Sequence, residues 1–334
     1  MIISMRTGSS RAELERVLSR AKELGCPARV LEDGALVALD PGMPLDPGLF
    51  EGLPGVREVL CPDDEHIPLA RRNGPGDTGI ELGGLRLGTI DFLVIAGPCA
   101  VESEAQLLAV ARAVKAAGAR ALRAGAFKPR TSPYAFRGLG IDGLRLAYAA
   151  AQEVGLPLVT EAVDLESLEK VAEAADVVQI GARSMQNYPL LQEAGKLRKP
   201  VLLKRGPSAS LDEWLLSAEY ILKGGNPRVI LCERGGRSAS DPGRNGLDLG
   251  FVLAARERTH LPVIVDPSHG TARRAWVPAM AKASLAVGGH GVMVEVHDRP
   301  EAALSDSKQS LSLEEFRALM DGLRALAPVQ GRTL

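Results

Sequence analysis

Apolar residues of this 334-residue chain recur as short runs separated by stretches with helical spacing. Between Phe92 and Val296, a short apolar run ends in a charged or sulfur-bearing residue and a helical stretch follows, eight times in all. The runs are FLVIAG, RALRAG, LPLVTE, VVQIGA, VLLKRG, VILCER, VIVDPS and VMVEVH. Segments between them, such as 103–118 and 164–175, have apolar residues at helical spacing. The pattern predicts an α/β fold, a (β/α)8 TIM barrel with all eight reactive strand ends on one rim.

The first part of the chain, residues 1–62, predicts a separate small domain. Its sequence predicts strands at 2–7, 28–32, 35–40 and 56–60, a helix at 11–25 and a short helix at 45–53. This βαββαβ order is that of a ferredoxin-like domain, with Asp33-Gly34 as a hairpin turn and Ser9 or Ser10 as a helix cap. No catalytic cluster is found here. The domain is therefore either a structural or oligomerisation element or a sensor for a small effector.

The remaining segments complete the expected domain plan. Residues 63–79 are polar, contain several Pro and Gly residues and lack periodicity, which predicts a linker. Residues 80–334 are assigned to the barrel, and 79–88 are expected to form a small hairpin that closes its bottom. The tail at 311–329 predicts an amphipathic helix over the eighth strand.

Composition excludes several classes of function. The chain has 40 basic and 41 acidic residues, so a net charge of -1 gives no reason to expect nucleic acid or a membrane surface as partner. The cysteines form no CxxC pair, and a chain of this size buries a large core without disulfides. No leader and no long apolar stretch is found. We therefore expect a cytoplasmic protein with reduced cysteines.

Residues at the predicted rim have the chemistry of divalent metal ligands. They are Cys99, His269, Glu295 and Asp306. Thiolate, imidazole and carboxylates suit a borderline transition metal better than magnesium or calcium. Three of them have another interpretation: Cys99 as a buried small residue, although its turn favours exposure, His269 as a hydrogen-bond partner of Asp266, and Glu295 as the partner of an arginine. His297 lies on the same strand face as Glu295 and is interpreted as hydrogen-bonding support, with metal ligation as the other interpretation.

Basic residues gather at the ends of four predicted strands. They are Arg123, Lys128, Arg130, Arg183, Lys204, Arg205 and Arg234. Converging cations repel one another unless an anion lies among them, and the planar guanidinium suits phosphate and carboxylate. The rim is therefore predicted to bind highly anionic, phosphorylated small molecules beside the metal.

Segments at seven of the eight strand ends and in the final loop resemble a known family. They are AGPCAVES at 96–103, RAGAFKPRTSPYAFRGLG at 123–140, QIGARSMQN at 179–187, LLKRG at 202–206, CERGGR at 232–237, DPSHG at 266–270 and MVEVHDRPEAALSDSKQSL at 293–311. In this order they resemble 3-deoxy-D-arabino-heptulosonate 7-phosphate (DAHP) synthase. The first domain resembles the ferredoxin-like regulatory domain of the subgroup in which it serves feedback inhibition.

The resemblance implies a metal-dependent transferase of the shikimate pathway, which leads to the aromatic amino acids. Such an enzyme condenses phosphoenolpyruvate with D-erythrose 4-phosphate and water, and releases DAHP and phosphate. It implies one divalent transition metal, Mn²⁺, Fe²⁺, Co²⁺ or Zn²⁺, at the four rim ligands. It also implies a homotetramer with tyrosine or phenylalanine as the effector.

The resemblance also assigns roles to the substrate-binding residues. Phosphoenolpyruvate is expected among Arg123, Lys128, Arg183, Lys204 and Arg234. Arg130, Thr131 and Ser184 are expected to hold the phosphate of the aldose. Lys128 as proton donor, Glu161 as the group that orients water, and His269 form the expected catalytic set.

Two other functions fit parts of the pattern. The first is 3-deoxy-D-manno-octulosonate 8-phosphate synthase, which shares the barrel, but its second-strand loop reads like KANRSS whereas this chain has KPRTS at 128–132. Metal-independent members of that relative have Asn at the position of Cys99, so the cysteine indicates metal dependence. The second is a metal-dependent barrel hydrolase of phosphorylated metabolites, for which Cys99 is an unusual ligand.

Overall fold

The structure of the chain, a computed structural model, describes residues 1–31, 34–39, 46–60, 69–70, 76–129, 132, 134–237 and 245–334. It divides into two compact units, Met1–Leu69 and Ala70–Leu334. Most of the expected linker, together with Asp33, Arg130 and Thr131, lies outside the described residues. None of the described helices is long and apolar enough to cross a membrane.

The first unit has the predicted βαββαβ order. Its elements are β1 (Ile2–Met5), α1 (Arg11–Glu23), β2 (Ala28–Leu31), β3 (Leu36–Leu39), α2 (Gly48–Glu51) and β4 (Val56–Leu60). The strands form an antiparallel sheet in the order β2-β3-β1-β4, as in a ferredoxin-like domain. Ser10 begins α1 with a capping box: its Oγ accepts a hydrogen bond from Glu13 N, and the Glu13 carboxylate accepts one from Ser10 N. The ferredoxin-like prediction is confirmed.

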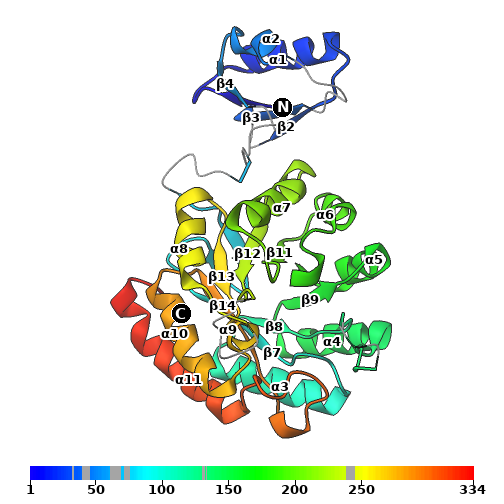
Figure 1. Ribbon diagram of the computed structural model, residues 1–334, viewed down its shortest axis with the longest axis vertical. Coiled ribbons are helices and arrows are strands. Elements are labelled where there is room, and N and C mark those ends of the chain that lie inside the picture. Colours follow the sequence, from blue (N-terminus) through cyan, green and yellow to red (C-terminus); the bar gives the residue numbers. More distant parts are fainter. Residues whose placement is uncertain are drawn as a thin grey trace. The chain divides into compact units, whose positions relative to one another are not determined.

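The second unit contains the predicted barrel (Figure 1). Its parallel strands are β7 (Leu93–Gly97), β8 (Ala121–Arg123), β9 (Leu158–Ala162), β10 (Val177–Ile180), β11 (Val201–Lys204), β12 (Val229–Glu233), β13 (Val263–Val265) and β14 (Gly291–Glu295). They pair in sequence, and β14 pairs with β7 to close the sheet. The eight apolar runs thus form eight strands with their carboxyl ends on one rim, which confirms the TIM barrel.

Helices surround the barrel and cover the outward faces of its strands. They are α3 (Glu104–Ala117), α4 (Gly140–Val154), α5 (Leu165–Ala174), α6 (Tyr188–Ala194), α7 (Leu211–Lys223), α8 (Leu249–Arg258), α10 (Val277–Ala286) and α11 (Leu313–Leu326). A short additional helix, α9 (Pro267–Thr271), lies in the loop after β13 and was not predicted. As expected, α11 buries Phe316, Leu319, Met320 and Leu323, and it packs beside α3 and α10.

A hairpin closes the amino end of the barrel, as predicted. Its strands β5 (Ile80–Leu82) and β6 (Leu85–Leu87) are antiparallel, and Ile80, Leu82 and Leu87 are buried. These side chains pack against residues at the strand starts, including Leu93 and Ala121. Because apolar groups fill this end, the opposite rim is left for chemistry.

Removing apolar contact from this hairpin should destabilise the barrel. Ile80 is 1% exposed, whereas Ile90, nearby in the sequence, is 60% exposed. Ile80→Ala should lower the free energy of unfolding by about 2 to 5 kcal/mol, and Ile90→Ala should change it by less than about 0.5 kcal/mol. Urea unfolding is followed by the fluorescence of Trp214 and Trp276, which both lie in the second unit. Equal unfolding midpoints for the two variants would contradict the hairpin's role.

Candidate active site

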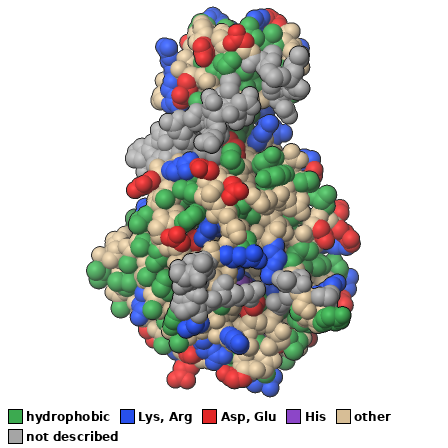
Figure 2. Space-filling view, viewed as in Figure 1, with side chains coloured by type: hydrophobic (Ala, Val, Ile, Leu, Met, Phe, Trp, Pro, Cys, Tyr) green, Lys and Arg blue, Asp and Glu red, His purple; other side chains and the backbone are tan. Residues whose placement is uncertain are grey.

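A cavity opens at the carboxyl ends of the barrel strands. Its lining comes from six strand ends and the loop after β14: Arg123, Lys128, Pro129, Glu161, Gln179, Gly181, Ala182, Arg183, Lys204, Arg234, His269 and Asp306. In Figure 2, Lys and Arg side chains gather beside a His side chain near the middle of the barrel unit. The structure therefore brings together all five cations that were expected around phosphoenolpyruvate.

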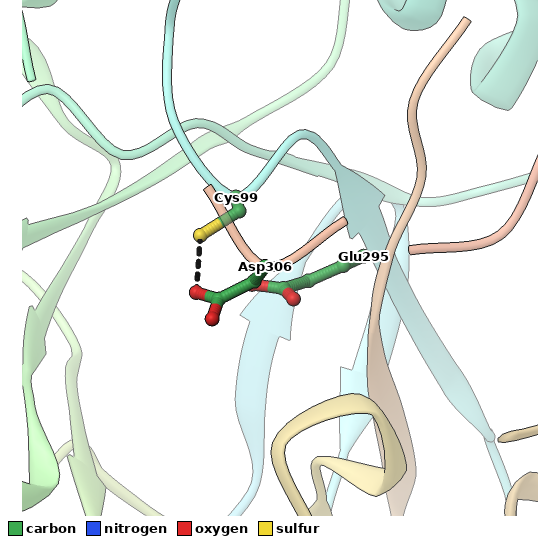
Figure 3. A group of neighbouring side chains, drawn as sticks. All are labelled: Cys99, Glu295 and Asp306. Atoms are coloured by element: carbon green, nitrogen blue, oxygen red, sulfur yellow. Dashed lines mark hydrogen bonds between the residues drawn. The ribbon is translucent and has the colours of Figure 1, made fainter. Parts of the chain in front are cut away.

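Three of the four predicted metal ligands form a tight group. The ligand atoms of Cys99, Glu295 and Asp306 all lie within 4.8 Å of one another (Figure 3). Cys99 follows β7, Glu295 ends β14, and Asp306 lies in the loop between β14 and α11. The Cys99 thiol donates a hydrogen bond of 2.9 Å to Oδ2 of Asp306. Asp306 has a φ of 51°, a left-handed conformation that is uncommon outside glycine and is often found at functional sites.

The fourth predicted ligand, His269, borders this group. Its Nε2 lies 3.4 Å from Oε1 of Glu295, and its Nδ1 lies 2.7 Å from Oδ2 of Asp266. The hydrogen bond to Asp266, which was the other interpretation of His269, is therefore present. It does not exclude metal binding, because a carboxylate commonly fixes the ring of a metal-binding histidine through the other nitrogen.

The group fits a divalent cation on the chemistry of its atoms. Glu295 is fully buried, and its Oε2 accepts a hydrogen bond of 2.6 Å from Gln309 Nε2. Its Oε1 has no hydrogen-bond donor among the described residues, although Nη2 of Arg123 is 3.1 Å away. A buried carboxylate oxygen without a donor is costly, and a cation compensates it. One sulfur and two carboxylates within reach of an imidazole suit a transition metal.

Burial determines the protonation of the thiol. Cys99 is 2% exposed, so its expected exposure at the rim is wrong. Burial, followed by the nearby Glu295 carboxylate, raises the pKa of Cys99 to about 12. Without a cation the group is therefore a thiol at neutral pH, and a divalent metal that binds the sulfur displaces its proton.

Asp266 connects the predicted metal ligands to the cations that line the cavity. The sequence analysis gave this residue no functional role of its own. Its Oδ2 lies 2.5 Å from Nζ of Lys204 and 2.7 Å from Nδ1 of His269, and its Oδ1 accepts the His269 backbone N–H. Burial acts to raise the pKa of Asp266, but His269 and Lys204 outweigh it and hold that pKa well below its ordinary value. One ionised carboxylate thus orients both a candidate metal ligand and a cavity cation.

Glu161, the penultimate residue of β9, lines the cavity. The side chain is 7% exposed, and its Oε2 accepts a hydrogen bond of 3.0 Å from Gln179 Nε2. A Cβ atom at Gly181 would lie 1.9 Å from Oε1 of Glu161, so only glycine leaves room for the carboxylate there. Lys128 also lines the cavity. Burial by itself would lower its pKa, but Cys99 and Glu161 raise it above the ordinary value, so Lys128 is a cation.

Two other residues lie differently from expectation. Arg205 does not line the cavity, because its guanidinium pairs with the buried Glu233 and stacks over Phe251. His297 lies beside Glu102, with Nε2 3.4 Å from its Oε2, rather than against the ligand group. Glu102 also accepts the backbone N–H of Leu304 in the loop that carries Asp306.

The residues expected around the aldose phosphate are only partly described. Ser184 is buried and lies in a short 3-10 helix, Ala182–Ser184, but it is not among the residues that line the cavity. Arg130 and Thr131 lie outside the described residues. Pro129, directly before them, lines the cavity.

Comparisons with known proteins agree with this geometry. Residues 80–327 match the model of the DAHP synthetase I family. The chain is 43% identical over 336 residues to phospho-2-dehydro-3-deoxyheptonate aldolase of Thermotoga maritima, with 99% of each chain covered. It is 33% identical over 266 residues to 2-dehydro-3-deoxyphosphooctonate aldolase of Syntrophotalea carbinolica, with 74% of this chain and 95% of that protein covered.

Solved structures give the same relationship. The crystal structure of the Thermotoga maritima DAHP synthase superposes with a TM-score of 0.79 at 42% identity, and covers 99% of this chain and 98% of that one. A truncated form of the same enzyme has a TM-score of 0.75 at 45% identity, and covers 80% of this chain and 98% of that one.

Loss of the Asp266 charge should destabilise the barrel far more than loss of an exposed one. Asp266→Asn leaves Lys204 buried without a full counter-charge, which should cost about 3 to 5 kcal/mol. The matched control is Asp142→Asn, where an exposed carboxylate 3.5 Å from Arg145 is lost and less than about 1 kcal/mol is expected. Denaturant unfolding of both variants at neutral pH measures the difference. Equal losses would show that the Asp266 contacts are not formed.

Proposed function

The chain belongs to the DAHP synthetase I family, and we propose that it condenses phosphoenolpyruvate with D-erythrose 4-phosphate and water, giving DAHP and inorganic phosphate. This reaction is the first step of the shikimate pathway to the aromatic amino acids. The observation that carries the proposal is the position of the Cys99, Glu295 and Asp306 group, which adjoins a cavity lined by five cations.

The cations are proposed to hold phosphoenolpyruvate, whose phosphate and carboxylate are both anionic. Arg123 and Lys204 already have carboxylate partners, Glu295 and Asp266. These contacts fix the two side chains before substrate arrives, so less conformational entropy is lost on binding. Arg183, Arg234 and Lys128 complete the set.

Cys99, His269, Glu295 and Asp306 are proposed to hold one divalent transition metal, with Mn²⁺, Fe²⁺, Co²⁺ and Zn²⁺ all compatible with these donors. When bound, the metal would supply a Lewis acid that stabilises negative charge on the aldehyde oxygen of the aldose. His269 is also counted among the catalytic residues, since Asp266 orients its ring beside Glu295.

Protein side chains are proposed to donate the proton and to orient the water molecule that the reaction requires. Carbon three of phosphoenolpyruvate attacks the aldehyde carbon, and Lys128 donates a proton to the oxygen that becomes a hydroxyl. Carbon two then accepts a water molecule that Glu161 orients. Gln179 fixes the Glu161 carboxylate through its Oε2, which supports a positioning role for that carboxylate.

The aldose is proposed to enter beside Pro129, where Arg130, Thr131 and Ser184 would hold its phosphate. An octulosonate synthase is the second candidate, because several 2-dehydro-3-deoxyphosphooctonate aldolases are similar to the barrel part of the chain. The heptonate aldolase of Thermotoga maritima matches at higher identity and along nearly the whole chain. That match favours the four-carbon aldose.

The reaction and its metal are tested in one assay. We expect phosphoenolpyruvate and D-erythrose 4-phosphate to disappear together in a one-to-one ratio, to stop reacting after chelation, and to react again when one divalent metal is restored. Loss of one substrate without the other would indicate a hydrolase. Faster reaction with the five-carbon aldose phosphate would indicate the octulosonate enzyme.

Replacement of the thiol tests the ligand set without turnover. Cys99→Ala should lower the metal content of the purified chain at least about 10-fold. Mutation of a residue that only hydrogen-bonds to a metal ligand already lowers metal affinity by about that factor. Cys26→Ala, at a buried cysteine in the first unit, should leave the metal content unchanged. Elemental analysis by mass spectrometry measures both. Equal metal content would remove Cys99 from the ligand set.

The first domain is proposed to bind tyrosine or phenylalanine and inhibit a homotetramer. Deletion of residues 1–62 should leave an active barrel that neither amino acid inhibits. A barrel without this domain is a reasonable fragment, since a truncated form of the Thermotoga maritima enzyme covers 80% of this chain. Initial rates of the full-length and the truncated enzyme, measured with and without each amino acid, test the inhibition. A full-length enzyme insensitive to both would contradict the sensor role.

A further inference from the structure

A second cavity lies next to the candidate active site on the same rim. The two cavities share Ala182 and Arg183 in their walls. The second is bounded by the segment after β10, the loop between β11 and α7, Glu213 of α7, and Arg237 after β12. The functional assignments made so far leave Arg237 without a role.

Positive charge exceeds negative charge in this second cavity. It contains two guanidinium groups, Arg183 and Arg237, and neither forms a side-chain hydrogen bond or ion pair with any residue in the described part of the chain. Among the described residues that line it, Glu213 provides the one carboxylate. Its Oε2 caps α7 by accepting a hydrogen bond of 2.8 Å from Ser210 N, and its Oε1 lies 3.4 Å from Gln186 Nε2. Both carboxylate oxygens are therefore engaged, whereas neither guanidinium has a side-chain partner among the described residues, so both can contact an anion.

Backbone contacts fix the position of Arg237. Its N–H donates a hydrogen bond of 2.6 Å to the carbonyl oxygen of Pro207, across the cavity wall. The preceding Gly236 exchanges two hydrogen bonds with Gly246, of 3.0 and 2.8 Å. A Cβ atom at Gly236 would lie 3.1 Å from Nη1 of Arg205, which is tighter than an ordinary contact. The chain thus holds Arg237 beside the loop after β11.

We propose that this second cavity receives the phosphate released from the central cavity, and binds it as a dianion between Arg183 and Arg237. The inference rests on the proposed reaction. In that reaction, the hydroxyl that water places on carbon two becomes the ketone oxygen as the bond from carbon two to the phosphate oxygen breaks. The hydroxyl proton passes to the departing phosphate, which leaves as the hydrogen phosphate dianion. Because Arg183 lines both cavities, the departing anion keeps one guanidinium partner while it gains the second.

Phosphate inhibition tests this step. Arg237→Gln should raise the inhibition constant of added inorganic phosphate about 10-fold, because a charge-assisted contact is lost, while the KM for each substrate changes less than about twofold. The inhibition constant of the Arg237→Lys variant should lie between those of the unchanged chain and the Arg237→Gln variant. Arg145→Gln is the control for loss of an exposed arginine, since Arg145 lines neither of these cavities. An unchanged inhibition constant with a raised KM for erythrose 4-phosphate would assign the cavity to the aldose phosphate and overturn the proposal.

A binding measurement separates this inference from the proposed function. Calorimetric titration of the full chain with inorganic phosphate, in the presence of saturating phosphoenolpyruvate, needs no turnover. Phosphate should still bind, and Arg237→Gln should weaken that binding about 10-fold while Arg145→Gln leaves it unchanged. Absence of phosphate binding, or equal binding by the Arg237→Gln variant, would overturn the proposal even in an active enzyme. Arg237-dependent binding by a chain without synthase activity would instead refute only the proposed reaction.

Discussion

Pairing of the last barrel strand with the first is the constraint on which the site depends. β14 and β7 pair in parallel from Gly291 opposite Leu93 to Glu295 opposite Gly97. This register places Glu295 beside the turn that carries Cys99, and the loop after β14 returns Asp306 to the thiol across 207 residues of sequence. A Cβ atom at Gly97 would lie 2.0 Å from the carbonyl oxygen of Arg123, so glycine is needed where β7 and β8 approach. Without closure, the ligand group does not exist.

The charges at the rim are arranged as interlocking pairs rather than isolated ions. Arg123 pairs with Glu295, and Lys204 pairs with Asp266, which also holds His269. Even so, Glu295 Oε1 and Arg123 Nη1 have no hydrogen-bond partner among the described residues. Buried polar atoms without partners lower stability, and such costs are typically found at functional sites. The barrel tolerates them because its amino end and outer layer are packed with apolar side chains.

Much of this arrangement could be predicted from the sequence, because apolar runs and helical spacing determine the elements and a barrel determines which ends meet. The orientation of single side chains was harder to predict. Lys204 and Arg205 are consecutive, and strand alternation sends one into the cavity and the other to Glu233, a signal the sequence did contain. For Asp266 the sequence indicated the contact to His269, but not the ion pair with Lys204, which joins residues 62 positions apart and has no local sequence signal. Gln309 contacts Glu295 only through the fold of the final loop, which no periodic pattern reveals.

The proposed chemistry requires sulfur, imidazole and two carboxylates to meet at one cation. The most direct test is a crystal structure of the chain grown with Mn²⁺, with anomalous diffraction used to locate the ion. We expect one strong anomalous peak within bonding distance, on the order of 2.0 to 2.5 Å, of Cys99 Sγ, His269 Nε2 and carboxylate oxygens of Glu295 and Asp306. An ion bound elsewhere, or a peak at this rim that leaves Cys99 and His269 uncoordinated, would contradict it.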